Sequence, residues 1–228
     1  MSMPFYVPPE QMMREKADFA RKGIARGRAL VALQYSEGIV LVAENPSNSL
    51  RKISEIYDRI AFAGVGKYNE FDQLRQAGVR AADLLGYQFS RGDVEGRSLA
   101  NQYAQIMGQA FTHESKPLEV EILVAEVGHD ASGDCMFHIT YDGTVMDEKV
   151  SCVLGGDAES ITARLQGADP AVGLASAVAM AAAALAGPDR TLAVGDLEVA
   201  VLRRGSERRC FARIDDGEVS RMLAVGNS

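Results

Sequence analysis

The sequence predicts an α+β fold, a four-layer αββα sandwich in which two antiparallel β-sheets pack face to face between two layers of helices. Strand-like and helix-like segments come in blocks: hairpin, strand, helix pair, hairpin, helix pair, hairpin, helix. A doubly wound parallel sheet would instead require strict alternation of strands and helices. Hydrophobic residues make up 47% of the 228 residues, which is enough for a large core. Length and composition predict one domain over residues 1–228.

Residues 10–23 are predicted to form an N-terminal helix that begins at about Pro9, because proline suits the first helical position. Gly23 is a suitable stop signal. Residues 1–9 contain three prolines that are incompatible with a helix interior, and residues 28–228 form the sandwich. An apolar stripe at helical spacing supports the helix: Met13, Ala17, Ala20 and Ile24.

The strands are predicted from runs of β-branched and other apolar residues bounded by turn residues. An Asp-Gly pair at 142–143 predicts a two-residue hairpin turn. The polar stretch 44–52 is predicted to be a loop. The predicted strands are Leu30–Tyr35, Ile39–Ala43, Ile60–Val65, Val120–Val127, Cys135–Tyr141, a strand from Thr144 onward, Leu197–Leu202 and Arg209–Ile214.

The remaining helices are predicted from apolar spacing and from capping residues. Asn69 caps a helix whose apolar face is Phe71, Leu74, Ala81 and Leu85. A second helix covers about Val94–Thr112, with Leu99, Tyr103, Ile106 and Ala110 on one face. Later helices are Ala158–Leu165, Pro170–Ala186 with Asp169 as its cap, and Asp215 to about Ala224.

The charge balance disfavours a nucleic-acid binder. Lys and Arg number 24 against 31 Asp and Glu, so the net charge is −7, whereas general binding of nucleic acid needs a basic surface. The longest apolar run, Ala171–Ala186, is shorter than the roughly 20 strongly apolar residues of a membrane span, so no membrane partner is expected.

Cysteine and histidine usage favours a reducing compartment without a metal site. Cys135, Cys152 and Cys210 are odd in number and form no CxxC pair, which argues against a disulfide framework and for the cytoplasm. The three histidines lack the spacing of metal ligands, and no motif calls for a cofactor.

Two further motifs carry little chemistry. Gly64-Val65-Gly66-Lys67 has the wrong spacing for a phosphate-binding loop, and no GxSxG nucleophile elbow occurs. Glu119 and Glu121 share a strand face and could pair for acid–base work, but a solvated strand end is the favoured interpretation.

Several blocks, all in order, resemble 20S proteasome α-subunits, and the actinobacterial type most closely. The resemblance covers essentially the whole chain and implies the αββα fold of the N-terminal-nucleophile hydrolases. The blocks are PPEQMMREKADFARKGIARG, GRALVALQYSEGIVLVAENP, KISEIYDRIAFAGVGKYNEFDQLR, SKPLEVEILVAEVG and ITYDGTV.

This resemblance implies a chain without catalytic residues. Catalytic β-subunits of the family begin at a threonine that opens the first strand, with its own amine as base and an aspartate and a lysine nearby. Here the strand opens at Arg28-Ala29 and about 27 residues precede it. Glu44 takes the place of the aspartate, and Ile56 falls about where the lysine would be, so nucleophile, base and lysine are all expected to be missing.

The resemblance also implies an assembly. Seven α-subunits form each outer ring and pack on a ring of β-subunits and on neighbouring α-subunits. The leading residues resemble the gate that closes the central pore, although a frayed terminus is the plainer alternative. The expected gate residues are Phe5, Tyr6, Val7, Pro8 and Pro9.

A docking site for an activating ATPase ring is implied as well. Lys52 corresponds to the lysine that receives the C-terminal carboxylate of the activator, and Gly66 and Lys67 correspond to other lining positions. A solvated surface lysine is the alternative for Lys52. The bacterial system further implies unfolded substrates marked by a small protein modifier.

Two other functions remain as alternatives. A catalytically active N-terminal-nucleophile peptidase would need autocleavage before a Thr, Ser or Cys, and none opens the first strand. A small-molecule enzyme would need convergent polar residues in a pocket, and the sequence indicates none.

Overall fold

The computed structural model describes residues 8–47, 49–206 and 209–226. Its helices are α1 (Pro9–Ala25), α2 (Tyr68–Gln88), α3 (Gly96–His113), α4 (Ala158–Arg164), α5 (Leu174–Ala186) and α6 (Asp216–Gly226). Its strands are β1 (Leu30–Tyr35), β2 (Gly38–Glu44), β3 (Ile53–Tyr57), β4 (Ile60–Gly66), β5 (Val120–Glu126), β6 (Cys135–Ile139), β7 (Val145–Glu148), β8 (Ser151–Leu154), β9 (Leu197–Arg203) and β10 (Phe211–Ile214).

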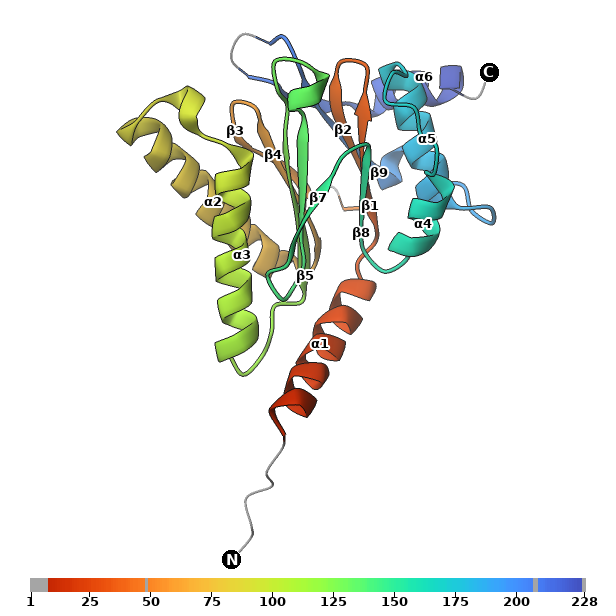
Figure 1. The fold of residues 1–228 in the computed structure, drawn as a ribbon. Coiled ribbons are helices and arrows are strands. Elements are labelled where there is room, and N and C mark those ends of the chain that lie inside the picture. Colours follow the sequence, from red (N-terminus) through yellow and green to blue (C-terminus); the bar gives the residue numbers. More distant parts are fainter. Residues whose placement is uncertain (1–7, 48, 207–208, 227–228) are drawn as a thin grey trace, which may run out of the picture.

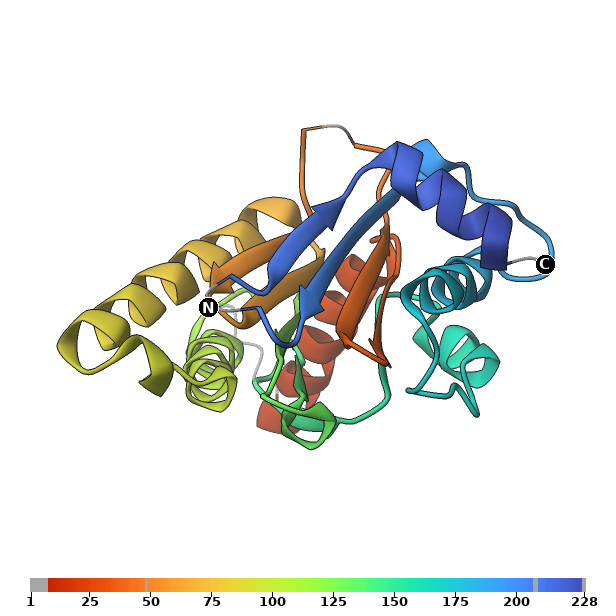
Figure 2. The same cartoon turned by 90° about the horizontal axis from the view of Figure 1, so that it is seen from above.

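The strands form two antiparallel sheets, which confirms the predicted sandwich. One sheet has the order β10-β9-β2-β1-β8 and the other β3-β4-β5-β6-β7. Helices α2 and α3 cover the outer face of the second sheet, and α4, α5 and α6 cover that of the first (Figures 1 and 2). The four layers are therefore helices, sheet, sheet and helices.

Three apolar layers hold the sandwich together. Leu30, Ala32 and Leu41 lie between the two sheets, together with Leu123 of the opposite sheet. Val31, Leu33, Val40 and Val42 point to the other side, against α5. Strands β1 and β2 are therefore buried on both faces, which explains why they read as continuous apolar runs rather than as alternating ones. The third layer joins the second sheet to α2 and α3.

Helix α1 is longer than predicted. It continues through Gly23 and Ile24 and ends at Ala25. A side chain at position 23 would meet Glu119, since an added Cβ would lie 2.4 Å from its Oε1 atom. Gly23 thus permits close approach of α1 to the second sheet and does not stop the helix.

Two strands escaped the sequence analysis, β3 and β8. Strand β3 carries a bulge between Glu55 and Tyr57 that breaks the alternation of buried and exposed residues. Strand β8 has only four residues and pairs with β1 at the edge of its sheet. Both were too short or too irregular for a periodicity argument.

Helix α5 begins at Leu174 and not at Pro170. The Asp169 carboxylate accepts a hydrogen bond from the Ala171 N–H at 2.8 Å, which makes a local turn in place of a helix cap. The Val172 carbonyl accepts from the Ser36 N–H at 3.0 Å and is thereby drawn out of helical geometry. The predicted start of this helix was therefore four residues too early.

Other local predictions were partly right. Gly143, with φ +85°, closes a three-residue turn after Thr140, so the predicted two-residue turn was wrong. Asn69 lies inside α2, which Lys67 precedes as the cap position. On α3, Ile106 is exposed and Met107 is buried in its place. The predicted cap of the last helix is confirmed, since Asp215 accepts from the Glu218 N–H at 2.9 Å.

Candidate functional site

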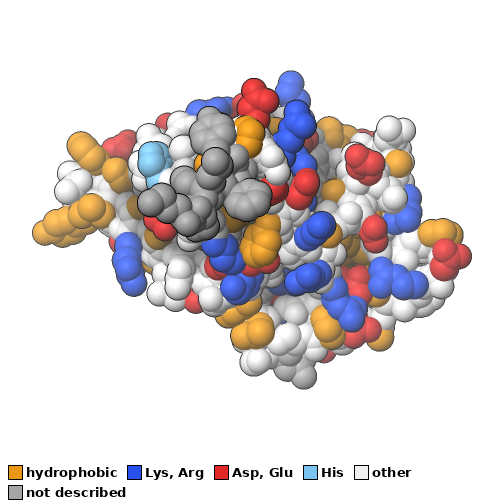
Figure 3. Space-filling view, turned by 90° about the horizontal axis from the view of Figure 1, so that it is seen from below, with side chains coloured by type: hydrophobic (Ala, Val, Ile, Leu, Met, Phe, Trp, Pro, Cys, Tyr) orange, Lys and Arg blue, Asp and Glu red, His pale blue; other side chains and the backbone are white. Residues whose placement is uncertain are grey.

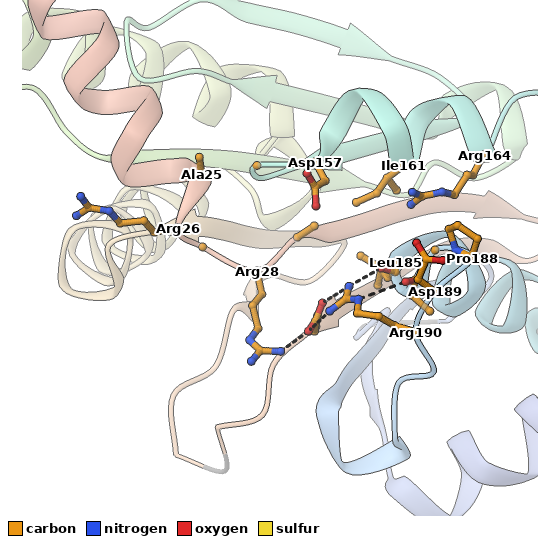
Figure 4. Close-up of a pocket in the computed structure, with 16 residues that line it drawn as sticks. Ala25, Arg26, Arg28, Asp157, Ile161, Arg164, Leu185, Pro188, Asp189 and Arg190 are labelled. Atoms are coloured by element: carbon orange, nitrogen blue, oxygen red, sulfur yellow. Dashed lines mark hydrogen bonds and ion pairs between the residues drawn. The ribbon is translucent and has the colours of Figure 1, made fainter.

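The start of β1 is the centre of a charged cluster. The ammonium of Lys52 donates a hydrogen bond to the carbonyl of Arg28 at 2.6 Å. The guanidinium of Arg28 pairs with Glu44, and Arg190 reaches the same carboxylate with two contacts of 3.2 Å (Figure 4). A lysine, a carboxylate and two arginines therefore lie close together at the linker between α1 and β1.

Glu44 is held in its charged form. Its side chain is only 5% exposed, and burial by itself would raise the pKa of the carboxyl. The hydrogen bonds from Arg190 and Arg28 outweigh burial and keep the pKa of Glu44 below its ordinary value.

Lys52 is partly buried, and this affects its charge. Burial lowers the pKa of Lys52 to about 8, because a desolvated ammonium is disfavoured. The carboxylates of Glu198 and Glu44 oppose this shift, and the neighbouring Arg28 adds to it. The lysine is consequently charged near neutral pH but loses its proton far more readily than a surface lysine does.

Gly66 joins the same region through the linker between α1 and β1. Gly27 packs against Val65 and Gly66, so that an added Cβ on Gly27 would lie 3.0 Å from the Gly66 nitrogen. The backbone of Lys52 pairs with that of Gly64 in the β3–β4 ladder, its carbonyl accepting at 3.0 Å. The structure therefore brings Lys52 and Gly66 to the same linker.

Lys67 lies one residue farther on and is engaged elsewhere. Its ammonium lies 3.5 Å from Glu70 and 3.9 Å from Glu119. Lys116 contacts the same two carboxylates at 2.8 Å each. Of the two lysines expected at a docking site, Lys52 lies in the charged cluster and Lys67 in a separate ion-pair group at the start of α2.

An open pocket of about 600 Å³ adjoins the charged cluster. It lies between the end of α1, the start of α4 and the end of α5 (Figure 4). Lysine and arginine side chains are frequent on this side of the molecule, with acidic side chains among them (Figure 3). The charged residues that line the pocket are Arg26, Arg28, Glu44, Asp157, Arg164, Asp189 and Arg190.

Helix α1 is fixed to the body at two places. Lys16 donates hydrogen bonds to the carbonyls of Phe111 at 3.0 Å and Glu114 at 2.7 Å, at the end of α3. Ala20 and Ile24 are buried beside Tyr141. The first turn of α1 points away from the two sheets (Figure 1). The described chain therefore begins, at Pro8, on the side of α1 that faces away from the sheets.

Only two of the expected gate residues belong to the described part of the chain. Phe5, Tyr6 and Val7 lie outside it. Pro8 is exposed and its carbonyl accepts from the Met12 N–H at 3.1 Å, while Pro9 is already the first residue of α1. The helix therefore begins at Pro9, as predicted, and the gate assignment of residues 1–9 stays a prediction.

The glutamates considered for acid–base work do not pair with each other. Glu119 lies 2.8 Å from Lys116, and Glu121 lies 3.5 Å from His138. Both carboxylates are largely buried, so the interpretation as a solvated strand end was also wrong.

No helix in the described part of the chain is long and apolar enough to cross a membrane.

Comparison with known proteins identifies the family. The family model described as Proteasome subunit matches residues 24–201. The chain belongs to the proteasome subunit family. Among its relatives, the proteasome subunit alpha of Acidimicrobium ferrooxidans is 58% identical over 98% of this chain and 97% of that protein. Those of Xylanimonas cellulosilytica and Thermobifida fusca are 54% and 53% identical, over 94% and 98% of this chain and 93% and 91% of those proteins.

The structure corrects the expected position of the lysine that a proteasome β-subunit has near the start of β1. Ile56 was expected where a proteasome β-subunit has its lysine, but Ile56 is buried between the second sheet and α2 and α3. The lysine beside the opening of β1 is Lys52, and Glu44 stands near it. This proteasome subunit therefore has a lysine and a carboxylate at that place.

The opening of β1 itself offers no nucleophile. Arg28 and Ala29 occupy it, and neither side chain is a hydroxyl or a thiol. The backbone continues without a break from Pro8 through α1 to Ala29, so the amide of Ala29 is in a peptide bond. Lys52 and Glu44 therefore lie beside an opening whose side chains are those of an arginine and an alanine.

Proposed function

We infer that this chain is a non-catalytic α-subunit of a 20S proteasome that forms the outer rings, gates substrate entry and docks an activating ATPase. The observation that carries the proposal is Lys52, a partly buried lysine that donates to the carbonyl of Arg28, in a chain whose relatives are proteasome subunits alpha. Lys52 does not itself line the 600 Å³ pocket, but Arg28 does. The partners that follow are neighbouring α-subunits in a seven-membered ring, β-subunits, the ATPase ring and unfolded tagged proteins in the cytoplasm.

The docking role rests on the donors that Lys52 keeps available. An ammonium has three N–H donors, and within the described residues that of Lys52 makes one hydrogen bond, to Arg28. Two donors can therefore receive a carboxylate. The nearby arginines that line the pocket add positive charge, which favours an anionic chain end.

The proposal that the chain is non-catalytic rests on the residues at the start of β1, Arg28 and Ala29. A second candidate, an active N-terminal-nucleophile peptidase, is favoured by one observation, the presence of Lys52 and Glu44 beside that opening. It lacks the nucleophile, and we therefore place it second. A threonine-directed covalent inhibitor separates the two, because it should label the β-subunit of the assembled particle and leave this chain unlabelled. Labelling of this chain would overturn the non-catalytic assignment.

The proposed gating role rests on how α1 is attached to the rest of the subunit and on its direction. Lys16 and the buried Ala20 and Ile24 fix the helix to the body, whereas its first turn points away from the sheets. Residues that precede Pro8 can therefore meet their copies from neighbouring subunits at a ring centre. A frayed terminus is the competing interpretation, and deletion of the segment distinguishes the two.

The test of docking is Lys52→Ala in particles assembled with β-subunits. The readout is the rate of peptide hydrolysis with the ATPase divided by the rate of the same particles without it. A lysine–carboxylate contact contributes about 1.5–3 kcal/mol, so the affinity should fall roughly ten- to hundredfold. Lys149→Ala, an exposed lysine between β7 and β8, is the control and should leave the ratio unchanged. An unchanged ratio in Lys52→Ala would remove Lys52 from the site.

A further inference from the structure

Glu198 is a buried carboxylate that reaches across the sandwich. It lies on β9, where it shares a face with Ala200 of the layer between the sheets, and its side chain is 3% exposed. One oxygen accepts from the Lys52 N–H at 2.9 Å and the other from the Ile53 N–H at 3.2 Å. Asn45 and Arg213 each donate to it at 2.7 Å. A residue of the first sheet thus holds the backbone that enters β3 of the second sheet.

Arg213 holds the same point from the other side. Its second terminal nitrogen donates to the carbonyl of Ile53 at 2.6 Å. Asn45 in turn donates to the carbonyl of Leu50 at 2.7 Å. Backbone groups on both sides of Lys52 therefore accept hydrogen bonds from side chains or donate hydrogen bonds to them. They belong to the polar loop before Ile53, whose described residues 45–47 and 49–52 form neither helix nor strand.

We propose that Glu198 is a positioning residue for the docking lysine: it fixes the backbone of Lys52 so that the ammonium points to the opening of β1. This inference rests on the docking role proposed above. A long lysine side chain loses several rotatable degrees of freedom on binding, and a fixed backbone reduces the number that must be ordered.

The charge of Glu198 has a second consequence for Lys52. Burial lowers the pKa of the lysine, and the carboxylate of Glu198 opposes that shift. Removal of this negative charge should lower the pKa of Lys52 further, so that the lysine is neutral over a wider range of alkaline pH. The charge effect and the positioning effect therefore have separate readouts: loss of the charge moves the alkaline titration, whereas loss of positioning weakens binding near neutral pH, where Lys52 is protonated.

The variant that tests the proposal is Glu198→Gln, which keeps the shape and removes the charge. Particles are assembled from this chain and β-subunits, and peptide hydrolysis is stimulated with a short C-terminal peptide of a proteasome-activating ATPase. The same peptide with an amidated end controls for the carboxylate. The two readouts are the peptide concentration for half-maximal stimulation and the pH at which stimulation falls by half.

We expect Glu198→Gln to raise the half-maximal concentration about five- to tenfold near pH 7 and to move the alkaline midpoint to lower pH by roughly one unit. Asp134→Asn is the matched control. Asp134 is equally buried, pairs with Arg204 and accepts from the Gly128 N–H at 3.1 Å, but it lies near the far end of β1. Asp134→Asn should lower the stability of the subunit by a comparable amount but change neither the half-maximal concentration nor the alkaline midpoint.

Arg213→Gln supplies a second test with the opposite sign. Its side chain is 39% exposed and a glutamine keeps an N–H donor, so this variant disturbs the interior less than the loss of Arg213 to alanine would, and its melting temperature is measured alongside. Loss of the arginine leaves the Glu198 charge uncompensated, and the alkaline midpoint should move to higher pH. A downward shift or no shift would contradict the proposal.

The outcomes separate this inference from the docking role. If Lys52→Ala abolishes stimulation while Glu198→Gln behaves like Asp134→Asn, the positioning role is wrong and docking stands. If Lys52→Ala leaves stimulation unchanged, both are wrong. A raised half-maximal concentration near pH 7 in Glu198→Gln, absent in Asp134→Asn, together with a loss in Lys52→Ala supports both.

Discussion

Gly66 offers a quantitative test of how closely the elements around the site approach each other. Its φ is +113°, and an added Cβ would lie 2.0 Å from the carbonyl oxygen of Glu119 and 3.0 Å from the Cα of Val120. Both atoms belong to the backbone that pairs with Gly66 in the β4–β5 ladder. They cannot withdraw without breaking that pairing, so Gly66→Ala should destabilise the subunit strongly.

The expected loss follows from two contributions. A non-glycine residue held at such a φ costs on the order of 1–3 kcal/mol. Overpacking against neighbours that cannot move costs about 1–3 kcal/mol more. The midpoint of the sum is about 4 kcal/mol, which lowers the melting temperature of a chain of this length by roughly 8–16 °C.

The measurement is urea unfolding of the full-length chain followed by circular dichroism, with two glycine controls. Gly167 has φ +80° and no atom within 4 Å of an added Cβ, so Gly167→Ala reports the backbone cost alone. At Gly64 the nearest atoms are the Cγ, Cβ and Cδ2 atoms of the buried Phe71, at 2.8–3.0 Å, so Gly64→Ala reports overpacking without the positive φ. If Gly66→Ala and Gly167→Ala lose equal stability, the close approach to Glu119 has no energetic weight and the reasoning is wrong.

Three further predictions concern function and the mounting of α1. Deletion of residues 1–8 should raise peptide hydrolysis by the assembled particle severalfold, and that of an unfolded protein more, without lowering its melting temperature; unchanged rates would mean a frayed terminus. Stimulation by the ATPase should weaken about tenfold per pH unit above pH 8, where Lys52 loses the proton that a carboxylate partner requires, and a flat profile would refute this. Lys16→Met should speed amide exchange in α1 about fivefold, because the bonds to Phe111 and Glu114 are lost, and an unaltered rate would show that they do not anchor the helix.

The sandwich could be predicted because its inner strands are long and apolar on both faces. Runs such as Leu30–Tyr35 leave no doubt about burial, and turn residues mark their ends. Edge strands carry weaker signals. Four-residue β8 and bulged β3 were missed for this reason, although each completes one of the sheets.

The missed strand β3 also explains the error about Ile56. Without its pairing with β4, no register tied position 52 to position 64, and the lysine near the opening of β1 was counted four residues too far along. Glycines posed a similar difficulty. Gly23 has the residue type of a helix stop, yet its reason is the contact with Glu119, which is distant in sequence and visible only in the fold.

The charged cluster at the opening of β1 is stable without any catalytic task. Glu44 is almost fully buried and pairs with Arg28 and Arg190, and the Lys52 ammonium donates one of its three N–H groups to the Arg28 carbonyl. Removing one partner of such a cluster leaves an uncompensated buried charge, which costs several kcal/mol. Ala29, at the same opening, belongs to no ion pair, so its replacement carries no penalty of this kind. Lysine and carboxylate can therefore persist for structural reasons beside Arg28 and Ala29. The lysine keeps further N–H donors and contacts Arg28, which lines a pocket, and a docking site for a chain-terminal carboxylate requires such donors.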